Sequence, residues 1–257
     1  MRCVHLLNNS PITVPQGRRI FLSAQWRYLA MLNYEVDGDV LAAYVPRGTE
    51  LDSWGGKIYL SLVGFRFLNT RVWGMAIPFH RNFDEVNLRF YVRHSEGAEV
   101  RHGVVFIREF VPKTLIALVA RALYNEQYTA LPMKHKIEIE LNPTPFITTG
   151  YQCRVARLWH GFVARASGPP AEAEQESLAH FISEHNWGYA KQRDGGTSEY
   201  YVGHPPWRIW HDASAAFDGD AHALYGPPFG TLLSRAPDFS LIAEGSQVQV
   251  SAGRRIA

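Results

Sequence analysis

The densest group of polar side chains next to apolar ones lies in residues 78–89, PFHRNFDEVNLR. His80 and Glu85 are candidates for acid–base catalysis, because an imidazole with an ordinary pKa of about 6.5 and a carboxyl group can both exchange protons near neutral pH. The same side chains could instead stabilise a turn through hydrogen bonds. We therefore expect His80 and Glu85 to be either a catalytic pair or parts of a turn.

The segment Val86–Arg93 alternates between apolar and polar residues, which is typical of a β-strand. Asn87, Arg89 and Tyr91 share one face of this strand. If that face points into a barrel, the three side chains would bind a substrate. If it points outward, they form an ordinary solvated face, since antiparallel sheets often have one wet side. Both interpretations stay open at this point.

Arg27 is flanked by apolar and aromatic residues, Trp26 and Tyr28. A guanidinium group in such surroundings needs a carboxylate partner or an anionic ligand. The first alternative is an internal salt bridge, for example with Glu35 or Glu85. The second makes Arg27 a substrate-binding residue.

Lys134 is a second candidate cation, in the short run Lys134-His135-Lys136. In a pocket it would act as an amine or as a fixed positive charge. As part of a basic run it would be an ordinary surface lysine, which is where most lysines lie.

The sequence contains no recognisable metal-binding or phosphate-binding motif. His180, Glu184 and His185 have the spacing H-x-x-x-E-H, which differs from the H-E-x-x-H and H-x-x-E-H spacing of helical zinc enzymes. Asp218, Asp220 and His222 alternate without a companion cluster. The sequence also has no phosphate-binding loop and no G-x-S-x-G nucleophile motif. We expect neither a metal nor a cofactor.

These residues should be positioned by a β-rich framework with one main helix. Apolar patterns predict strands at 26–34, 58–67, 86–93, 103–110, 135–141, 151–159, 187–192, 198–202, 207–211 and 241–250. Helical spacing of apolar residues after Pro112 predicts the main helix, ending near Asn125. Short helices are expected at 40–45, 176–184, 220–225 and 229–234, and a surface loop at 164–177. This pattern predicts an α+β fold built on an extended antiparallel sheet or a barrel.

Composition limits the class of protein. The chain has 257 residues, 46% of them hydrophobic, which is enough for a sizeable core. Its net charge of +2 and scattered basic residues do not predict a nucleic-acid partner. Two isolated cysteines fit a reducing compartment, and no apolar run approaches the roughly 20 residues of a membrane span. With no signal-peptide pattern, a cytoplasmic location is expected.

Longer motifs resemble the YqjF-like family, a domain family of unknown function. They extend from about Phe21 to Arg255 and are FLSAQWRYLAMLNYEVD, VPRGTELDSWGGKIYLSLVGF, GMAIPFHRNFDEVNLRFYVR, ALYNEQYTALPMKHK, EHNWGY and IAEGSQVQV. This resemblance implies a family but no established activity. The EHNWGY motif, residues 184–189, has no known role.

A weaker resemblance links the chain to acetoacetate decarboxylase. It rests on Arg27-Tyr28, Tyr34-Glu35-Val36-Asp37, Leu41, Val45-Pro46, Ala76-Ile77-Pro78, Glu126 and Leu131-Pro132-Met133-Lys134. The resemblance implies a curved antiparallel sheet or cone-shaped barrel around a closed small-molecule pocket. It also implies substrate-binding roles for Arg27 and Glu126.

The reactive lysine of that enzyme has no counterpart in the expected place. Its first lysine in a Pro-Lys-Lys motif forms a Schiff base with a keto acid, and here that position is Met133. Lys134 corresponds to the neighbouring cation and would be a nucleophile only if the alignment slips by one residue. The enzyme's two pocket glutamates align near Leu60–Ser61 and Val72, so both are absent.

Two functions follow from these observations. In both, residues 1–20 are an N-terminal lead-in and residues 21–257 form one domain. The first is an enzyme with lyase-like activity on a small keto or carboxylate compound. There Arg27 holds an anionic group, while Lys134, His80 or Glu85 moves protons or charge. The second is a non-catalytic protein that binds a small molecule through the same residues. No membrane partner is expected, and a homo-oligomer is left open.

Overall fold

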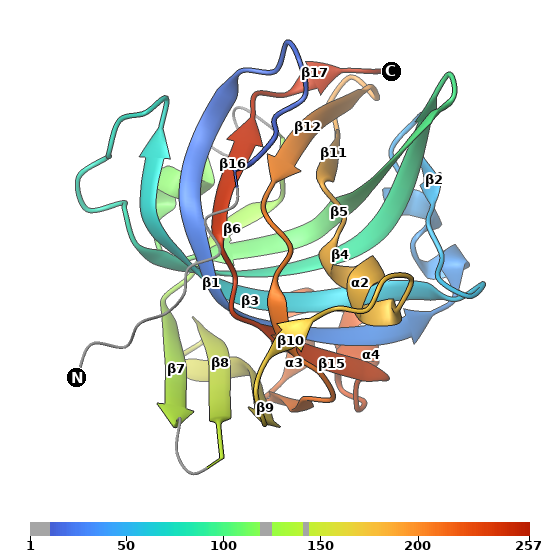
Figure 1. Cartoon of the computed structure of the whole chain (residues 1–257). Helices are drawn as coiled ribbons and strands as arrows, with labels where there is room; N and C mark the ends of the chain where they lie inside the picture. The colour runs from blue at the N-terminus through green and yellow to red at the C-terminus, as the bar shows by residue number, and fades with distance from the viewer. Residues whose placement is uncertain (1–10, 119–124, 141–143) are drawn as a thin grey trace.

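The computed structural model describes residues 11–118, 125–140 and 144–257, which are arranged around one large curved β-sheet (Figure 1). Seven of its strands pair in a closed ring, in the order β1, β3, β4, β5, β11, β12, β16 and back to β1. Their bounds are β1 Ile20–Val36, β3 Ile58–Val72, β4 Phe83–Glu96, β5 Glu99–Val111, β11 Trp187–Lys191, β12 Thr197–Gly203 and β16 Gln247–Ser251. The prediction of a β-rich fold built on a curved sheet or barrel is confirmed.

Shorter strands extend the ring. A branch from β1 continues through β15, β13 and β10, while β2 pairs with β4, β6 with β5, and β17 with β12. Their bounds are β2 Glu50–Leu51, β6 Tyr128–Ala130, β10 Ala171–Glu172, β13 Arg208–Trp210, β15 Phe239–Ala243 and β17 Arg254–Arg255. The ring is mostly antiparallel, but β5 pairs with β11 and β6 in parallel.

A second sheet covers the outside of the ring. It contains β14, β9, β8 and β7 in that order, and Figure 1 shows β7 and β8 extending away from the main sheet. The bounds are β7 Met133–Glu140, β8 Phe146–Val155, β9 Leu158–Ser167 and β14 Ser214–Asp218. Its apolar side packs with two short helices, α3 Ala221–Tyr225 and α4 Phe229–Leu233, against the main sheet.

The long strands are therefore buried on both faces. On β4, the apolar residues Val86, Leu88 and Phe90 join the core between the two sheets. Residues of the opposite face, such as Phe83 and Tyr91, join a second core inside the ring. This explains why the polar side chains of β4 are buried, although the alternating sequence also suits a strand with one solvated face.

Two β-bulges change which side chains point inward. The register of β1 against β3 shifts between Arg27 and Ala30, and that of β4 against β5 shifts opposite Leu88 and Arg89. A bulge inserts an extra residue and so breaks the alternation of a strand. The inward direction therefore moves from even to odd positions along β1 and β5.

Three of the four predicted short helices are confirmed as α2, α3 and α4, and the fourth differs in type. α2 spans Leu178–Ser183 and begins at Ser177, whose side chain accepts a hydrogen bond from the His180 amide. The predicted helix at 40–45 is wrong: this region forms two 3₁₀ turns, Gly38–Val40 and Ala42–Tyr44. Asp37 caps the first turn, because its carboxylate accepts a hydrogen bond from the Asp39 amide.

Two predicted strands are each interrupted. The stretch 151–159 contains the end of β8 and the start of β9, joined by a turn at Ala156-Arg157 with positive φ angles at both residues. The stretch 241–250 is divided between β15 and β16. Gly245 lies between them with φ +76°, and a Cβ there would come within 2.1 Å of the Trp26 carbonyl oxygen. A hydrogen-bonded hairpin and a close backbone contact are three-dimensional features that apolar patterns do not reveal.

The remaining predictions differ mainly in extent. The predicted loop 164–177 begins inside β9 and contains β10. The main predicted helix is helical over residues 114–118, and its continuation through 119–124 lies outside the described residues. Every helix in the described part of the chain is too short or too polar to span a bilayer.

Candidate functional site

A cavity of about 290 Å³ lies inside the ring of strands. Six of the seven ring strands contribute to its wall, through Leu22, Val63, Asn87, Phe106, Tyr200 and Val250. Much of the wall is aromatic: Phe21, Trp26, Phe65, Phe67, Phe83 and Phe106. This apolar surface suits a ligand with a largely hydrocarbon or aromatic body.

Polar side chains break the apolar wall. Three glutamates, Glu85, Glu109 and Glu126, line the cavity together with Asn87 and Arg89. All five residues are buried, with exposed fractions between 1% and 8%. Carboxyl groups in this number are uncommon in an apolar interior, because burying a charge without a partner is costly.

Strand pairing brings most of these groups together. Asn87 on β4 lies opposite Glu109 on β5, and Glu109 lies opposite Tyr128 on the parallel strand β6. The bulge in β5 lets both Phe106 and Glu109 line the cavity, although they are three positions apart in the chain. In a regular strand those two side chains would point to opposite faces.

Neutral hydrogen-bond donors hold two of the glutamates. Glu85 accepts from the Tyr128 hydroxyl at 3.0 Å and from Asn87 Nδ2 at 3.0 Å. Glu126 accepts from the Tyr200 hydroxyl at 2.8 Å. Tyr200 pairs across the sheet with Gly188, where a Cβ would come within 2.2 Å of the tyrosine ring. Gly188 therefore leaves the space that this ring occupies.

Burial raises the pKa of all three carboxyl groups. The pKa of Glu85 rises to about 7, although the bonds from Asn87 and Tyr128 and the charge of Arg89 oppose the rise. Burial raises the pKa of Glu126 to about 8, and it places the pKa of Glu109 well above the ordinary value. The charges of the other two glutamates add to the rise at Glu109. Protons are therefore held at this site near neutral pH.

Several polar atoms of the cavity wall lack a partner within the described part of the chain. They are Trp26 Nε1, Thr70 Oγ1, Asn87 Oδ1, Arg89 Nε and Glu109 Oε2. Buried polar atoms are nearly always hydrogen-bonded to protein, water or a ligand. Donors and acceptors are both present, so the cavity offers hydrogen bonds to a bound molecule.

The cavity reaches the surface near the β3–β4 connection. Ile77 and His80 from that connection line the cavity and are half-buried, and Leu115 is 49% exposed. The His80 Nδ1 atom lies 2.8 Å from the Pro78 carbonyl oxygen, as expected for a turn held by a side chain. His80 therefore stabilises this turn and also lies at the rim of the cavity.

Five of the eight residues proposed from the sequence line this cavity. They are His80, Glu85, Asn87, Arg89 and Glu126. Tyr91 lies on the same face of β4 but is fully buried beyond the cavity, where its hydroxyl lies 2.7 Å from Ser61 Oγ. The polar face of β4 therefore points inward, which decides between the two orientations that the sequence left open.

The structure places Lys134 elsewhere. It is exposed on β7, in the second sheet, and its ammonium nitrogen lies 4.4 Å from the centre of the Trp159 ring. Within the described chain, the residues that line the cavity include no lysine. Lys134 thus has the surroundings of a surface lysine that packs on an aromatic ring.

Arg27 also lies outside the cavity wall. Its Nη1 donates to the Gly245 carbonyl oxygen at 2.7 Å, and burial lowers its pKa although the charges of Tyr28 and Glu244 oppose this. The β1 bulge explains the position, because it turns Trp26 and Leu29 toward the cavity and leaves Arg27 facing away. The suggested partners are engaged elsewhere: Glu35 with Lys57, and Glu85 inside the cavity.

Sequence reasoning missed Glu109, Tyr128 and Tyr200. Glu109 had a usable signal, since it is an acidic residue within the apolar stretch GVVFIREFV. The tyrosines had none, because aromatic residues are ordinary in strands. Outside the cavity, Asp52, His102 and His185 form the one group of potential metal ligands found among the described residues.

Comparison of the sequence with protein families agrees with the resemblance noted above. The family model of DUF2071, described as an uncharacterised conserved protein, matches residues 23–247. The YqjF protein of Bacillus subtilis (strain 168) is 28% identical over 232 residues, covering 88% of this chain and 90% of that protein.

Several solved structures have a similar fold. The acetoacetate decarboxylase of Legionella pneumophila has a TM-score of 0.65 at 14% identity, covering 95% of this chain and 93% of that one. An acetoacetate decarboxylase-like enzyme from Sphingomonas wittichii RW1 has a TM-score of 0.61 at 12% identity, covering 95% and 98%. The enduracididine biosynthesis enzyme MppR complexed with pyruvate has a TM-score of 0.63 at 13% identity, covering 95% and 93%. These likenesses establish the fold.

Proposed function

We propose that this chain, which belongs to the DUF2071 family of uncharacterised conserved proteins, is an acid–base catalyst acting on a small carbonyl or carboxylate compound. The substrate lies in the cavity inside the ring, with its apolar part against the aromatic wall. The reaction proceeds through proton transfer by glutamates and needs no imine. The observation that carries this proposal is the group of three buried, proton-holding glutamates beside Arg89.

The roles of the glutamates follow from their surroundings. The positive charge of Arg89 favours the ionised form of Glu85, so this carboxyl group loses its proton first and is the base. Glu126 and Glu109 keep their protons at higher pH and can donate them to a carbonyl oxygen. A base and an acid with separated pKa values in one dry pocket are the usual requirement for moving a proton next to a carbonyl group.

The proton balance of this step is simple. Ionised Glu85 takes a proton from the carbon next to the carbonyl group. The electron pair of that C–H bond forms a C=C bond, and the π pair of the C=O bond moves to the carbonyl oxygen. A protonated carboxyl group, Glu126 or Glu109, stabilises the resulting oxygen by hydrogen bonding. Arg89, whose Nε has no partner within the described residues, binds a carboxylate of the substrate if one is present.

The structural neighbours favour the same class of ligand. One is described as a decarboxylase of acetoacetate and another as an enzyme complexed with pyruvate, and both compounds are small keto acids. Imine chemistry does not transfer with the fold, because Met133 stands at the expected lysine position and Lys134 is on the outer sheet. We therefore assign no catalytic role to Lys134 or to Arg27.

Deuterium exchange tests the proposal. A panel of small keto acids and ketones is incubated with the protein in D₂O, and loss of the proton next to the carbonyl is followed by NMR. At least one compound should exchange faster with the protein, and Glu85→Gln should reduce that rate by roughly 10²-fold or more. The matched control is Glu96→Gln, an exposed glutamate on the same strand, which should leave the rate unchanged.

The alternative function is non-catalytic binding of the same class of compound. It is favoured by the large aromatic share of the cavity wall, which suits recognition as well as catalysis. Saturation-transfer NMR distinguishes the two: a compound that binds but never exchanges its protons supports the binding protein. Borohydride trapping is a further check, since a lysine adduct lost in Lys134→Ala would contradict the imine-free reaction.

Two finer expectations remain proposals of the same kind. One is a cytoplasmic location, and the other is self-association into a homo-oligomer. The second has a surface to support it, since Trp73, Met75 and Phe79 are exposed on the β3–β4 connection. Sedimentation velocity of the purified chain at several concentrations measures whether it associates.

A further inference from the structure

A second group of titratable side chains, one aspartate and two histidines, lies outside the cavity. Asp52 follows β2, His102 is on β5, and His185 lies between α2 and β11. One ligand atom from each residue lies within 4.8 Å of the other two. The Asp52 Oδ2 atom is 2.6 Å from His102 Nδ1 and 3.2 Å from His185 Nε2. None of the three residues lines the cavity.

The hydrogen bonds of His185 assign its ring nitrogens. Its Nδ1 lies 2.6 Å from the Phe181 carbonyl oxygen, which can only accept, so Nδ1 carries the hydrogen. In the neutral ring, Nε2 then presents a lone pair toward the Asp52 carboxylate. Two lone pairs in such contact need a positive charge between them, either a second ring proton or a metal ion. A histidine that binds a metal typically gives its other N–H to a backbone carbonyl in this way.

The surroundings hold the ligands in position. The Ser53 amide donates to the other Asp52 oxygen, Oδ1, at 3.0 Å, which directs Oδ2 toward the two histidines. The His185 side chain is only 4% exposed, and the rings of Tyr91 and Phe181 each have their centres 4.7 Å from its own. Fixed ligands of this kind lower the cost of assembling a metal site.

We propose that Asp52 Oδ2, His102 Nδ1 and His185 Nε2 bind Zn²⁺ or a similar divalent transition metal. Two imidazoles and one carboxylate are a ligand set that this class of ion prefers. The fourth position is open to water on the side of His102, whose side chain is 51% exposed. Sequence spacing did not reveal the site, because its ligands come from three separate segments of the chain.

The site lies at a junction of the ring. β5 and β11 are joined by two residue pairs, Trp187 with Gly103 and Gly188 with Val104. His102 directly precedes Gly103, and His185 lies two residues before Trp187. A bound metal would therefore fasten the α2–β11 segment to β5 where the ring closes. This gives His185 of the EHNWGY motif a role outside the cavity.

Metal titration of the whole chain tests the site. The protein is stripped with a chelator and titrated with Zn²⁺ by calorimetry, and with Co²⁺ by visible spectroscopy. We expect one equivalent of each metal, d–d absorption of a low-coordinate Co²⁺ site, and a higher unfolding temperature with Zn²⁺. His185→Gln and His102→Gln should each weaken binding by about tenfold or more, since even the loss of an outer-shell partner commonly costs that much.

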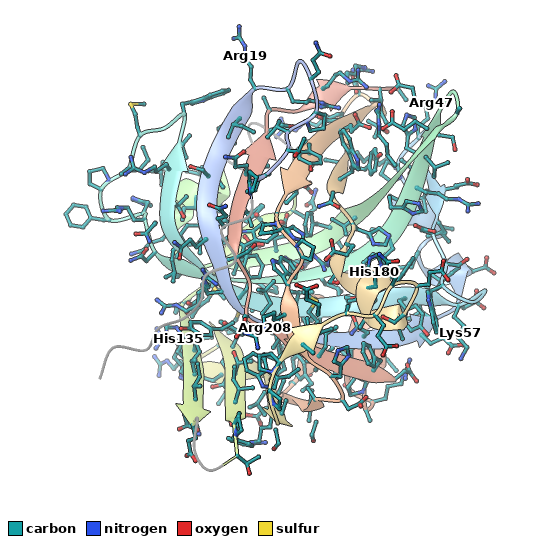
Figure 2. All side chains as sticks on the ribbon, viewed as in Figure 1. Arg19, Arg47, Lys57, His135, His180 and Arg208 are labelled. Atoms are coloured by element: carbon teal, nitrogen blue, oxygen red, sulfur yellow. The ribbon has the colours of Figure 1, made fainter. Side chains whose placement is uncertain are left out.

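A second histidine–aspartate pair provides the matched control. His135 Nδ1 lies 2.8 Å from Asp84 Oδ2, but no further imidazole belongs to this pair among the described ligand groups. Figure 2 shows His135 on β7, well apart from His180 on α2, the helix that leads to His185. His135→Gln should leave Zn²⁺ binding unchanged.

Three outcomes would overturn the proposal. They are the lack of stoichiometric binding, equal affinity in wild type and His185→Gln, and ¹⁵N shifts showing both His185 nitrogens protonated whether or not Zn²⁺ is added. The last would mean that a ring proton occupies the place given to the metal. His102→Gln is less at risk of misfolding than His185→Gln, because the half-exposed His102 side chain contributes less to the core. Circular dichroism checks that each variant is folded.

Discussion

Buried glutamates occur in two regions of this molecule, and their partners differ. Glu199 on β12 is fully buried, and its carboxylate forms ion pairs with Arg18, Arg101 and Arg254. The guanidinium groups of Arg18 and Arg101 also lie over the Trp187 ring. Among the described residues, the glutamates of the cavity share its wall with one arginine, Arg89, and their hydrogen bonds come from tyrosine hydroxyls and an amide.

The difference shows that burial alone does not identify a functional carboxyl group. Where three cations surround a carboxylate, its charge is compensated and its role is to hold segments of the chain together. Where neutral donors surround it, burial raises its pKa into the range useful for proton transfer. The sign of the neighbouring charges therefore distinguishes the structural glutamate from the candidate catalytic ones.

The largest effect is expected for Glu199→Ala. This change leaves the Arg18 guanidinium group, whose side chain is 9% exposed, without its carboxylate, while Arg101 keeps the exposed carboxylates of Glu96 and Glu99. We expect a loss of about 3–5 kcal/mol in the free energy of unfolding. Urea unfolding at pH 7 measures it. The control is Glu96→Ala, whose carboxylate also pairs with Arg101 and Arg254 but is 51% exposed, so the loss should be much smaller. Equal losses in the two variants would contradict the comparison.

The cavity glutamates should make stability fall as pH rises. Burial raises the pKa of Glu85 from 4.5 to about 7, so the folded state binds more protons than the unfolded state between these values. The resulting stability is fully present below the unfolded pKa and is lost as pH rises through the folded one. Glu85→Gln should remove about 3 kcal/mol of this loss between roughly pH 4 and pH 8. Urea unfolding across that range measures the slope, and an unchanged slope would contradict the assignment.

A smaller effect is expected for Arg89→Met, which removes the arginine that the described part of the chain places in the cavity wall. The charge of Arg89 opposes the rise in the pKa of Glu85, so its loss should raise that pKa further, by on the order of one unit. Carboxyl ¹³C NMR titration gives the midpoint. Arg66→Met is the control, since Arg66 pairs with Asp84 outside the cavity and should leave Glu85 unchanged.

The smallest effect is expected for Arg254→Ala at the other region. Arg254 is 50% exposed and is the outermost of the three cations around Glu199, so water replaces it readily. The free energy of unfolding should fall by less than about 1 kcal/mol. A loss as large as that of Glu199→Ala would mean that Arg254 alone compensates the buried charge.

Much of the main sheet could be predicted from the sequence. The alternation of Val86–Arg93 and the apolar stretch from Ile58 both lie inside observed strands, β4 and β3. Glu85, Asn87 and Arg89 were found because polar residues that alternate with apolar ones on a strand are conspicuous. Local periodicity predicts strands and their alternating faces, because both depend on residues that are close together in the chain.

The rest depends on contacts between distant segments. Glu126 and Tyr200 meet only because the ring closes, and their hydrogen bond joins residues 74 positions apart. Arg27 was expected in the pocket, but the β1 bulge reverses the alternation beside it. The hairpin at Ala156-Arg157 was missed because both of its strands have apolar residues, and only its turn separates them.

Closure of the ring also has a consequence for the order of folding. β1 pairs with β3 on one side, and on the other it pairs with β15 and β16, which lie about two hundred residues further along. During synthesis one edge of β1 therefore stays unpaired until residues 239–251 have left the ribosome. An open strand edge with apolar neighbours is prone to aggregate. The nascent chain should therefore depend on chaperones until its last strands emerge, and only then does the cavity exist.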